Sequence, residues 1–185
     1  MSVQIENLPP ARPTLTEFGA FAEHIGIRLV EWELDRRVIE FDFTDQNLNG
    51  TGVIHGGCLA TKLDTDIAHS AIYCTVPENY RSEATVNLSV NFVAAGRPGS
   101  QITIEARKMG GGRTMFMSVA EALDESGTVI GNAQDIGPYR GGCHKPERLP
   151  RPQGVELGKS PQRLNADDTN NEDKKERCFE TLNLF

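Results

Sequence analysis

Several features are scarce or missing in this chain of 185 residues. Its four cysteines are far apart with no C-x-x-C spacing, which argues against a zinc site and, in a chain of this size, against a disulfide framework. No apolar run approaches the roughly 18 to 20 residues of a membrane-spanning helix. The first residues, MSVQIENLPPARPTL, lack the pattern of a signal or transit peptide, so we expect a cytoplasmic protein.

Positive charge is also in short supply. The formal net charge is -7 at pH 7, which argues against a general nucleic-acid binder, because phosphate contacts need a basic face. A polyanionic ligand would have to be held by a local basic cluster. We expect neither a metal nor a cofactor.

The apolar patterns predict an α+β domain. A short helix is expected over residues 14–25, and a longer one from Cys58 to about Tyr73. The stretches GIRLVEWELD and RRVIEFDFTD alternate polar and apolar residues and read as a hairpin that turns near Asp35. Further strands are expected at about 83–94, 101–109, 113–123 and 128–136. Since the loops between them are hairpin-sized, we expect an antiparallel sheet of five or six strands with the long helix inserted after the first two.

The chain divides into three parts by composition. Residues 1–13 read as an N-terminal extension, and residues 14–140 as the folded domain. Residues 141–185 are rich in Pro, Gly, Asn and charge and have no sustained apolar period, so we expect a mostly disordered tail.

The long predicted helix carries two aspartates, Asp64 and Asp66. At about 100° per residue, Asp66 falls with Lys62 on the arc opposite the apolar one, which predicts a solvated face with a weak ion pair. Asp64 falls between Ala60 and Ala68 inside the apolar arc, where an unpartnered carboxylate is costly to bury. Two interpretations stay open for Asp64: a buried acid satisfied by backbone donors or an arginine, or an acid kept at a crevice as a base or nucleophile.

The start of that helix is glycine-rich. Gly56 and Gly57 let a ligand approach the backbone, and the free N-H groups of a helix N-terminus favour negative charge, so this place can hold a developing oxyanion. Alternatively, the glycines only make the tight turn into the helix. Gly56 and Asp64 are separated by about 12 Å of helix at 1.5 Å per residue. If they act together, a two-fold axis must bring the helix start of one subunit to the aspartate of another, which predicts at least a dimer.

The string His55-Gly56-Gly57, with an aspartate nine residues after the histidine, resembles the hotdog-fold acyl-CoA thioesterases of the phenylacetic-acid-degradation (PaaI-like) type. The resemblance covers roughly residues 14–137. It implies a sheet wrapped around one long helix and subunits joined into dimers, often tetramers. It also implies hydrolysis of an acyl- or aryl-CoA thioester to a carboxylic acid and free CoA.

The same resemblance implies roles for individual residues. Asp64 is the general base or nucleophile, and the Gly56 N-H is the donor to the thioester carbonyl. Asn49 helps place the carbonyl or the attacking water, His55 orients the carbonyl region, and Thr85 holds the water. Asn49 and Thr85 are also of residue types that loops and strands use for structural reasons alone.

Substrate binding is expected at Gly57 and at basic residues near the glycine run 110–112. The family commonly meets the CoA phosphates there, and side chains and backbone can grip phosphate together. The basic candidates there are Arg107, Lys108 and Arg113, and Arg97, in the turn Gly96-Arg97-Pro98-Gly99, is a further candidate of the same kind. The alternative is a solvated hairpin end.

Two departures from the family pattern are visible. Relatives often carry an apolar residue where this chain has Lys62, and their chains usually stop near residue 140. A non-catalytic acyl-CoA-binding hotdog module and a hotdog hydratase are the alternatives to a thioesterase. A pure binder gains little from Asp64, and the arrangement of acid and histidine that a hydratase usually uses is not found.

Overall fold

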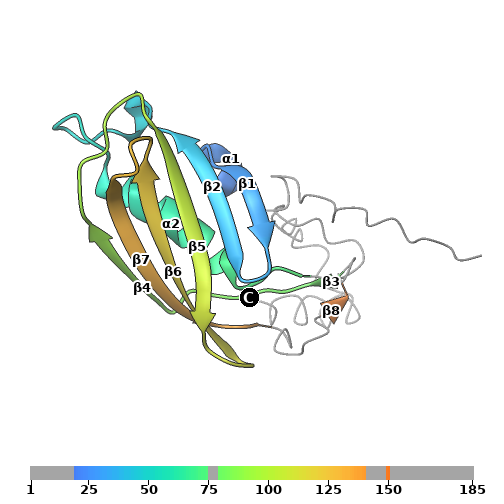
Figure 1. Ribbon diagram of the computed structural model, residues 1–185. Helices are drawn as coiled ribbons and strands as arrows, with labels where there is room; N and C mark the ends of the chain where they lie inside the picture. The colour runs from blue at the N-terminus through green and yellow to red at the C-terminus, as the bar shows by residue number, and fades with distance from the viewer. Residues whose placement is uncertain (1–18, 75–78, 141–148, 151–185) are drawn as a thin grey trace, which may run out of the picture.

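The computed structural model describes residues 19–74, 79–140 and 149–150. They form a six-stranded antiparallel sheet with a long helix packed against one face, and a separate two-stranded sheet of residues 79–80 and 149–150 (Figure 1). The six strands of this sheet lie in the order β1-β2-β5-β6-β7-β4. The predicted α+β fold is confirmed, including the helix inserted after the first two strands. The elements are α1 (Gly19–His24), β1 (Arg28–Glu33), β2 (Arg36–Asp42), the 3-10 helix η2 (Asp45–Asn47), α2 (Gly56–Ser70), β3 (Asn79–Tyr80), β4 (Asn87–Phe92), β5 (Gln101–Gly110), β6 (Met115–Asp124), β7 (Val129–Pro138) and β8 (Leu149–Pro150).

Two tight turns set the register of the sheet. Strands β1 and β2 are joined by a two-residue loop in which Asp35 has a φ of 62°, the left-handed conformation that hairpins of this length require. In the β5–β6 turn, Gly111 has a φ of 121°, and a Cβ atom there would overlap the carbonyl oxygen of Met115. A larger residue would therefore strain the turn.

The core lies between the sheet and α2. Strand β5 confirms the strand predicted at 101–109, and it alternates, with Ile102 and Ile104 buried while Thr103 stays partly exposed. The helix contributes Leu59, Leu63 and Ile67, each at most 1% exposed. Burying side chains of this size stabilises the fold by about 1.5 to 3 kcal/mol each. This packing holds α2, and with it the residues of the site, at a fixed place on the sheet.

The predicted helical phase of α2 is only partly correct. The apolar arc is buried, but Asp66 and Lys62, expected on a solvated face, are 0% and 1% exposed. Asp66 lies against Arg37 of β2, with its Oδ1 3.5 Å from Arg37 Nε, and Lys62 donates a hydrogen bond to the carbonyl of Ile25. The helix is therefore buried on its polar side as well as on its apolar side. Arg37 of the sheet and the Ile25 carbonyl at the end of α1 are the polar partners of Asp66 and Lys62 on that side.

Both edges of the sheet expose large apolar side chains, and Val30 and Leu34, on and beside β1, are 42% and 57% exposed. Strand β1 forms one edge and β4 the other. On and beside β4, Val86, Phe92 and Val93 are 70%, 59% and 56% exposed. An edge with unpaired backbone groups and large exposed apolar side chains is a template for pairing with another strand.

Some predictions fall outside the described residues. Helix α1 confirms the later part of the predicted helix over 14–25, whereas its expected start lies outside. Residues 1–13 lie outside as well, and so does the predicted disordered tail of 141–185, apart from β8. Within the described ranges, no helix is both long and apolar enough to cross a bilayer.

Candidate functional site

The start of α2 is organised by His55. His55 is the N-cap residue, and its Nδ1 accepts a hydrogen bond of 2.9 Å from the Gly57 N-H. Since Nδ1 acts as the acceptor, the neutral ring carries its proton on Nε2, which is left as a donor on an exposed side chain. The Gly56 N-H, at the first helical position, has no acceptor in the described part of the chain. The helix start therefore presents one backbone donor and one imidazole donor.

Asn49 lies in the loop that precedes the helix. Its Oδ1 accepts from the N-H and hydroxyl of Thr51 at 2.9 and 2.7 Å and from the Val53 N-H at 3.3 Å. This arrangement is an Asx-type turn, in which the side chain substitutes for a backbone acceptor. Asn49 thus shapes the loop, and its Nδ2 remains as a possible donor toward a ligand.

Asp64 is half-buried in the middle of α2. Its Oδ1 accepts a hydrogen bond of 3.1 Å from the Thr85 hydroxyl, which lies two residues before β4. The structure therefore brings together two residues 21 positions apart that the sequence assigned to one site. The contact supplies Asp64 with a partner that is neither a backbone donor nor an arginine.

A small apolar hollow of about 350 Å³ adjoins the helix start. Gly56 forms part of its wall, and the ring of Phe92 covers Gly56 so closely that a Cβ atom there would lie 3.2 Å from it. The rest of the wall is apolar and comes from Val53, Ile54, Leu59, Val93, Ala94, Ala95 and Ile130. An apolar group attached to a carbonyl at Gly56 would fit this environment.

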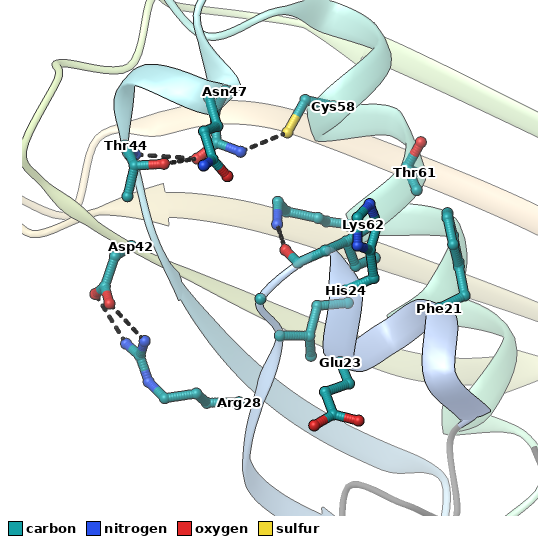
Figure 2. Close-up of a pocket in the computed structure, with 14 residues that line it drawn as sticks. Phe21, Glu23, His24, Arg28, Asp42, Thr44, Asn47, Cys58, Thr61 and Lys62 are labelled. Atoms are coloured by element: carbon teal, nitrogen blue, oxygen red, sulfur yellow. Dashed lines mark hydrogen bonds and ion pairs between the residues drawn. The ribbon is translucent and has the colours of Figure 1, made fainter.

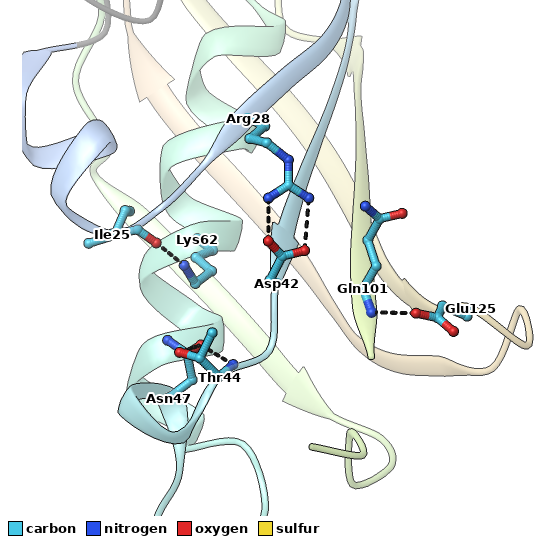
Figure 3. A network of polar contacts seen from close by, with 8 residues as sticks. All are labelled: Ile25, Arg28, Asp42, Thr44, Asn47, Lys62, Gln101 and Glu125. Carbon is cyan, nitrogen blue, oxygen red and sulfur yellow. Dashed lines mark hydrogen bonds and ion pairs between the residues drawn. The ribbon is translucent and has the colours of Figure 1, made fainter. Parts of the chain in front are cut away.

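A larger hollow of about 640 Å³ lies on the other side of α2, between α1, β2 and η2 (Figure 2). Asn47 donates a 3.3 Å hydrogen bond to the Cys58 sulfur in its wall. Lys62 points to the carbonyl of Ile25 (Figure 3). Its Nζ lies 4.2 Å from the centre of the Phe41 ring. Burial lowers the pKa of Lys62, and its contact with the end of α1 ties the two helices together.

The four basic candidates do not gather in one place. Arg107 pairs with Glu105 at 2.5 Å, and Lys108 pairs with Asp35 at 3.1 Å. Arg113 is exposed in the β5–β6 turn. Arg97 is exposed near the opposite end of β5. At the rise of a strand, about 3.3 Å per residue, the length of β5 puts about 30 Å between Arg97 and the β5–β6 turn. Within a single chain, Arg97 therefore cannot act with the other three.

Two acids near Asp64 were missed by reasoning from the sequence. Asp135 of β7 is 0% exposed, and its Oδ2 lies 3.4 Å from the Thr85 hydroxyl. Glu83 is half-buried, and its pKa is raised to about 7 by burial and by Asp135 and Asp64. The alternation of β7 could have predicted that Asp135 is buried, because Asp135 lies on the same inward face of the strand as Ala133.

A buried polar cluster was missed as well. Burial raises the pKa of Asp66 to about 7 despite the opposing effect of Arg37, and lowers the pKa of Arg37 to about 10. Burial and Arg37 lower the pKa of His69 to about 3. The indole of Trp32 donates to the His69 carbonyl at 3.2 Å. These groups lie on the β1–β2 side of α2, and Asp66 faces Arg37 there.

Comparison with known proteins gives the following relatives. A family model described as the thioesterase superfamily matches residues 51–130. Acyl-coenzyme A thioesterase 13 of Mus musculus is 27% identical over 132 residues, which are 70% of this chain and 92% of that protein.

Solved structures share the fold. The E. coli PaaI protein from the phenylacetic acid degradation operon superposes with a TM-score of 0.60 at 21% identity, over 66% of this chain and 86% of that one. The smu.793 protein of Streptococcus mutans, bound to acetyl CoA, superposes with a TM-score of 0.53 at 19% identity, over 63% of this chain and 90% of that one.

Proposed function

We propose that this chain is a hotdog-fold thioesterase of the PaaI-like type that hydrolyses an acyl- or aryl-coenzyme A, because a thioesterase superfamily model matches residues 51–130 and the E. coli PaaI protein shares the fold. The products are a carboxylic acid and free CoA. The name of the mouse relative and the acetyl CoA bound to the S. mutans protein support this substrate class.

The position of Asp64 is the observation that carries the proposal. It is the half-buried acid of α2, and Thr85 holds one of its oxygens at 3.1 Å beside the exposed edge of the sheet. Its second oxygen is then available to a water molecule or to the substrate carbon. Asp64 acts either as the base that removes a proton from water or as the nucleophile that attacks the thioester carbonyl.

The helix start polarises the carbonyl. As the charge on the carbonyl oxygen grows during attack, the Gly56 N-H donates to it and the positive end of the helix dipole stabilises it. The Nε2-H of His55 is placed to assist, since Nδ1 already accepts from Gly57. Asn49 contributes through Nδ2, while its Oδ1 holds the loop in shape.

The site is formed between two subunits. Phe92, at the end of β4, packs on Gly56, and Thr85, just before the start of β4, bonds Asp64. If two copies pair antiparallel through this edge, the Phe92 end of each β4 meets the Thr85 end of the other. That two-fold arrangement brings the Gly56 of one subunit to the Asp64 of the next, and the exposed apolar residues of the edge become buried.

The acyl and CoA parts of the substrate occupy different surroundings. The hollow of about 350 Å³ beside Gly56 accepts the acyl group. The CoA phosphates meet Arg113 and Arg107 of the β5–β6 turn region, with Lys108 more firmly held by Asp35. Because the two-fold axis reverses the direction of β4, Arg97 of one subunit approaches the same end of the site as Arg113 of the other.

The test is turnover of a panel of acyl- and aryl-CoA thioesters by the wild type and by Asp64→Asn. We expect hydrolysis of at least one thioester by the wild type and a large loss of kcat in the variant. Asp42→Asn changes an exposed aspartate of β2 that is paired with Arg28 of β1; this variant is the matched control and should keep full activity. Hydrolysis that survives Asp64→Asn would remove Asp64 from the mechanism, and binding without turnover of any thioester would favour a non-catalytic module.

A further inference from the structure

A second carboxyl group lies behind Asp64. Asp135 of β7 is 0% exposed, and the Thr85 hydroxyl lies between the two acids, 3.1 Å from Asp64 Oδ1 and 3.4 Å from Asp135 Oδ2. A hydroxyl group has a single proton and therefore can donate to only one of these oxygens at a time. If both acids are ionised, one of them faces the hydroxyl oxygen without a hydrogen bond.

The groups that surround Asp135 disfavour its ionised form. Asp64 faces it from α2, Glu83 from the segment before β4, and the neutral Ser118 is its register partner on β6. Arg140, just beyond β7, lowers the pKa of Glu83. In the described part of the chain, Asp135 forms no ion pair and its Oδ1 has no hydrogen-bond partner. Burial and the charge of Asp64 raise the pKa of Asp135 to about 6, against the opposing effect of hydrogen bonds from Thr85 and the Ile136 N-H.

A protonated Asp135 resolves the conflict. A carboxylic acid can donate to the Thr85 oxygen, and the Thr85 proton is then directed to Asp64. Every contact in this chain of three groups becomes a normal hydrogen bond, and only one negative charge remains on the pair of aspartates.

We propose that Asp135 is a positioning residue that, while protonated, donates a hydrogen bond to the Thr85 oxygen, so that the Thr85 hydroxyl is committed to Oδ1 of Asp64. The inference rests on the proposed function, in which Asp64 is the catalytic carboxylate. No proton is transferred and no covalent bond changes. Asp135 acts only by setting which way the Thr85 hydroxyl points and by withholding a second negative charge from the site.

In the reaction, the hydrogen bond from Thr85 fixes the orientation of the Asp64 carboxylate. With Oδ1 held by Thr85, the second oxygen faces the water or the thioester carbon. When Asp135 ionises, the Thr85 proton is shared between two carboxylates and Asp64 loses its fixed orientation. A plot of kcat against pH should therefore show an inflection caused by the ionisation of Asp135, with the lower kcat on the alkaline side.

The experiment compares Asp135→Asn with Asp135→Ala. The asparagine keeps the shape and a donor toward Thr85 at every pH, so kcat should stay within about threefold of the wild type below the inflection, and the inflection should vanish from its pH profile. The alanine lacks the donor, and its kcat should fall about tenfold or more with a smaller change in KM. Thermal unfolding of each variant shows whether the fold is kept.

A double-mutant comparison separates positioning from a general structural effect. In the Thr85→Val background, which has no hydroxyl to orient, Asp135→Asn and Asp135→Ala should have the same activity. If the difference between them persists without Thr85, or if Asp135→Asn is as damaging as Asp135→Ala in the wild-type background, the proposal is overturned.

A measurement without turnover keeps the proposal distinct from the thioesterase function. The carboxyl carbon of Asp135, followed by NMR in protein labelled at aspartate, should titrate well above an ordinary aspartate and should shift toward the ordinary value in Asp64→Asn. This holds even if no thioester in the panel is hydrolysed, an outcome that would overturn only the proposed function. An ordinary aspartate titration of Asp135 in the wild type overturns the positioning role.

Discussion

The ring of Phe92 lies 3.2 Å from the position that a Cβ atom would take on Gly56. Distances of this kind are tighter than most real side-chain contacts, so any larger residue at position 56 pushes on the ring. Phe92 is 59% exposed and belongs to the edge strand β4, which leaves the ring some room to move. The contact links the start of α2 to the edge through which we propose that two subunits pair.

The Gly56 N-H can be removed with little change to the helix. Proline is well tolerated at the first helical position, and the preceding residue, His55, already has the extended conformation that proline requires, with φ -68° and ψ 126°. We expect Gly56→Pro to have a kcat about 10² to 10³ lower than Gly56→Ala, which keeps the N-H and meets Phe92 in the same way. Steady-state kinetics on the best thioester measures the difference. Equal rates in the two variants would exclude the Gly56 N-H as the carbonyl donor.

The inter-subunit site predicts complementation. A mixed dimer of one Asp64→Asn subunit and one Gly56→Pro subunit contains one site with both groups intact and one with neither. We therefore expect two nearly inactive homodimers to yield a heterodimer with about half the wild-type activity per dimer. Differently tagged subunits, purified as the heterodimer, provide the measurement. A heterodimer as inactive as its parents would place both groups in the same subunit's site.

The two edges of the sheet offer a matched test of assembly. Val86 lies beside β4 and Val30 lies on β1, and both side chains are exposed. A lysine on a pairing edge places charge in the interface, so Val86→Lys should weaken dimerisation about tenfold or more, while Val30→Lys should leave it unchanged. Sedimentation equilibrium over a range of concentrations measures both. Dissociation caused by Val30→Lys alone would move the interface to β1.

The buried pair of Asp66 and Arg37 predicts a pH dependence of stability. The pKa of Asp66 is raised from 3.8 to about 7 in the folded chain, so the folded state holds its proton more tightly than the unfolded state. The stability that this group contributes is present below about pH 4 and is lost as the pH rises to about 7. Relative to Asp66→Asn, the free energy of unfolding of the wild type should fall across this window, by at most about 4 kcal/mol.

Denaturant unfolding of both proteins at several pH values tests this prediction. Asp42→Asn is the control of opposite sign, because the hydrogen bond from Arg28 lowers the pKa of Asp42. The wild type should gain stability relative to that variant as the pH rises through the lowered pKa. A difference between wild type and Asp66→Asn that does not vary with pH would show that Asp66 titrates normally.

Local patterns were sufficient to predict the elements and their order. Period-two alternation in stretches such as RRVIEFDFTD and the helical spacing of Leu59, Leu63 and Ile67 depend on neighbours along the chain, and these predictions agree with the sheet and with α2. The helix was predicted to start at Cys58, and α2 starts two residues earlier, at Gly56. Short loops made the antiparallel arrangement the natural one.

The environment of each acid could not be predicted in this way. The helical phase predicted that Asp66 faces solvent, because it describes one helix without the elements packed against it. In the folded chain, Arg37 of β2 covers Asp66. Thr85 and Asp135 reach Asp64 from 21 and 71 positions away, a distance that no local pattern spans.

The sequence by itself thus determined the α+β architecture and the motif of His55, Gly56 and Asp64, since periodicity and spacing along one chain are enough for both. Only the tertiary structure decided which acid is buried with a cation and which is held at the sheet edge by Thr85. The physical reason is that the energy of a charge depends on the groups that surround it in space, and those groups come from strands distant in the sequence.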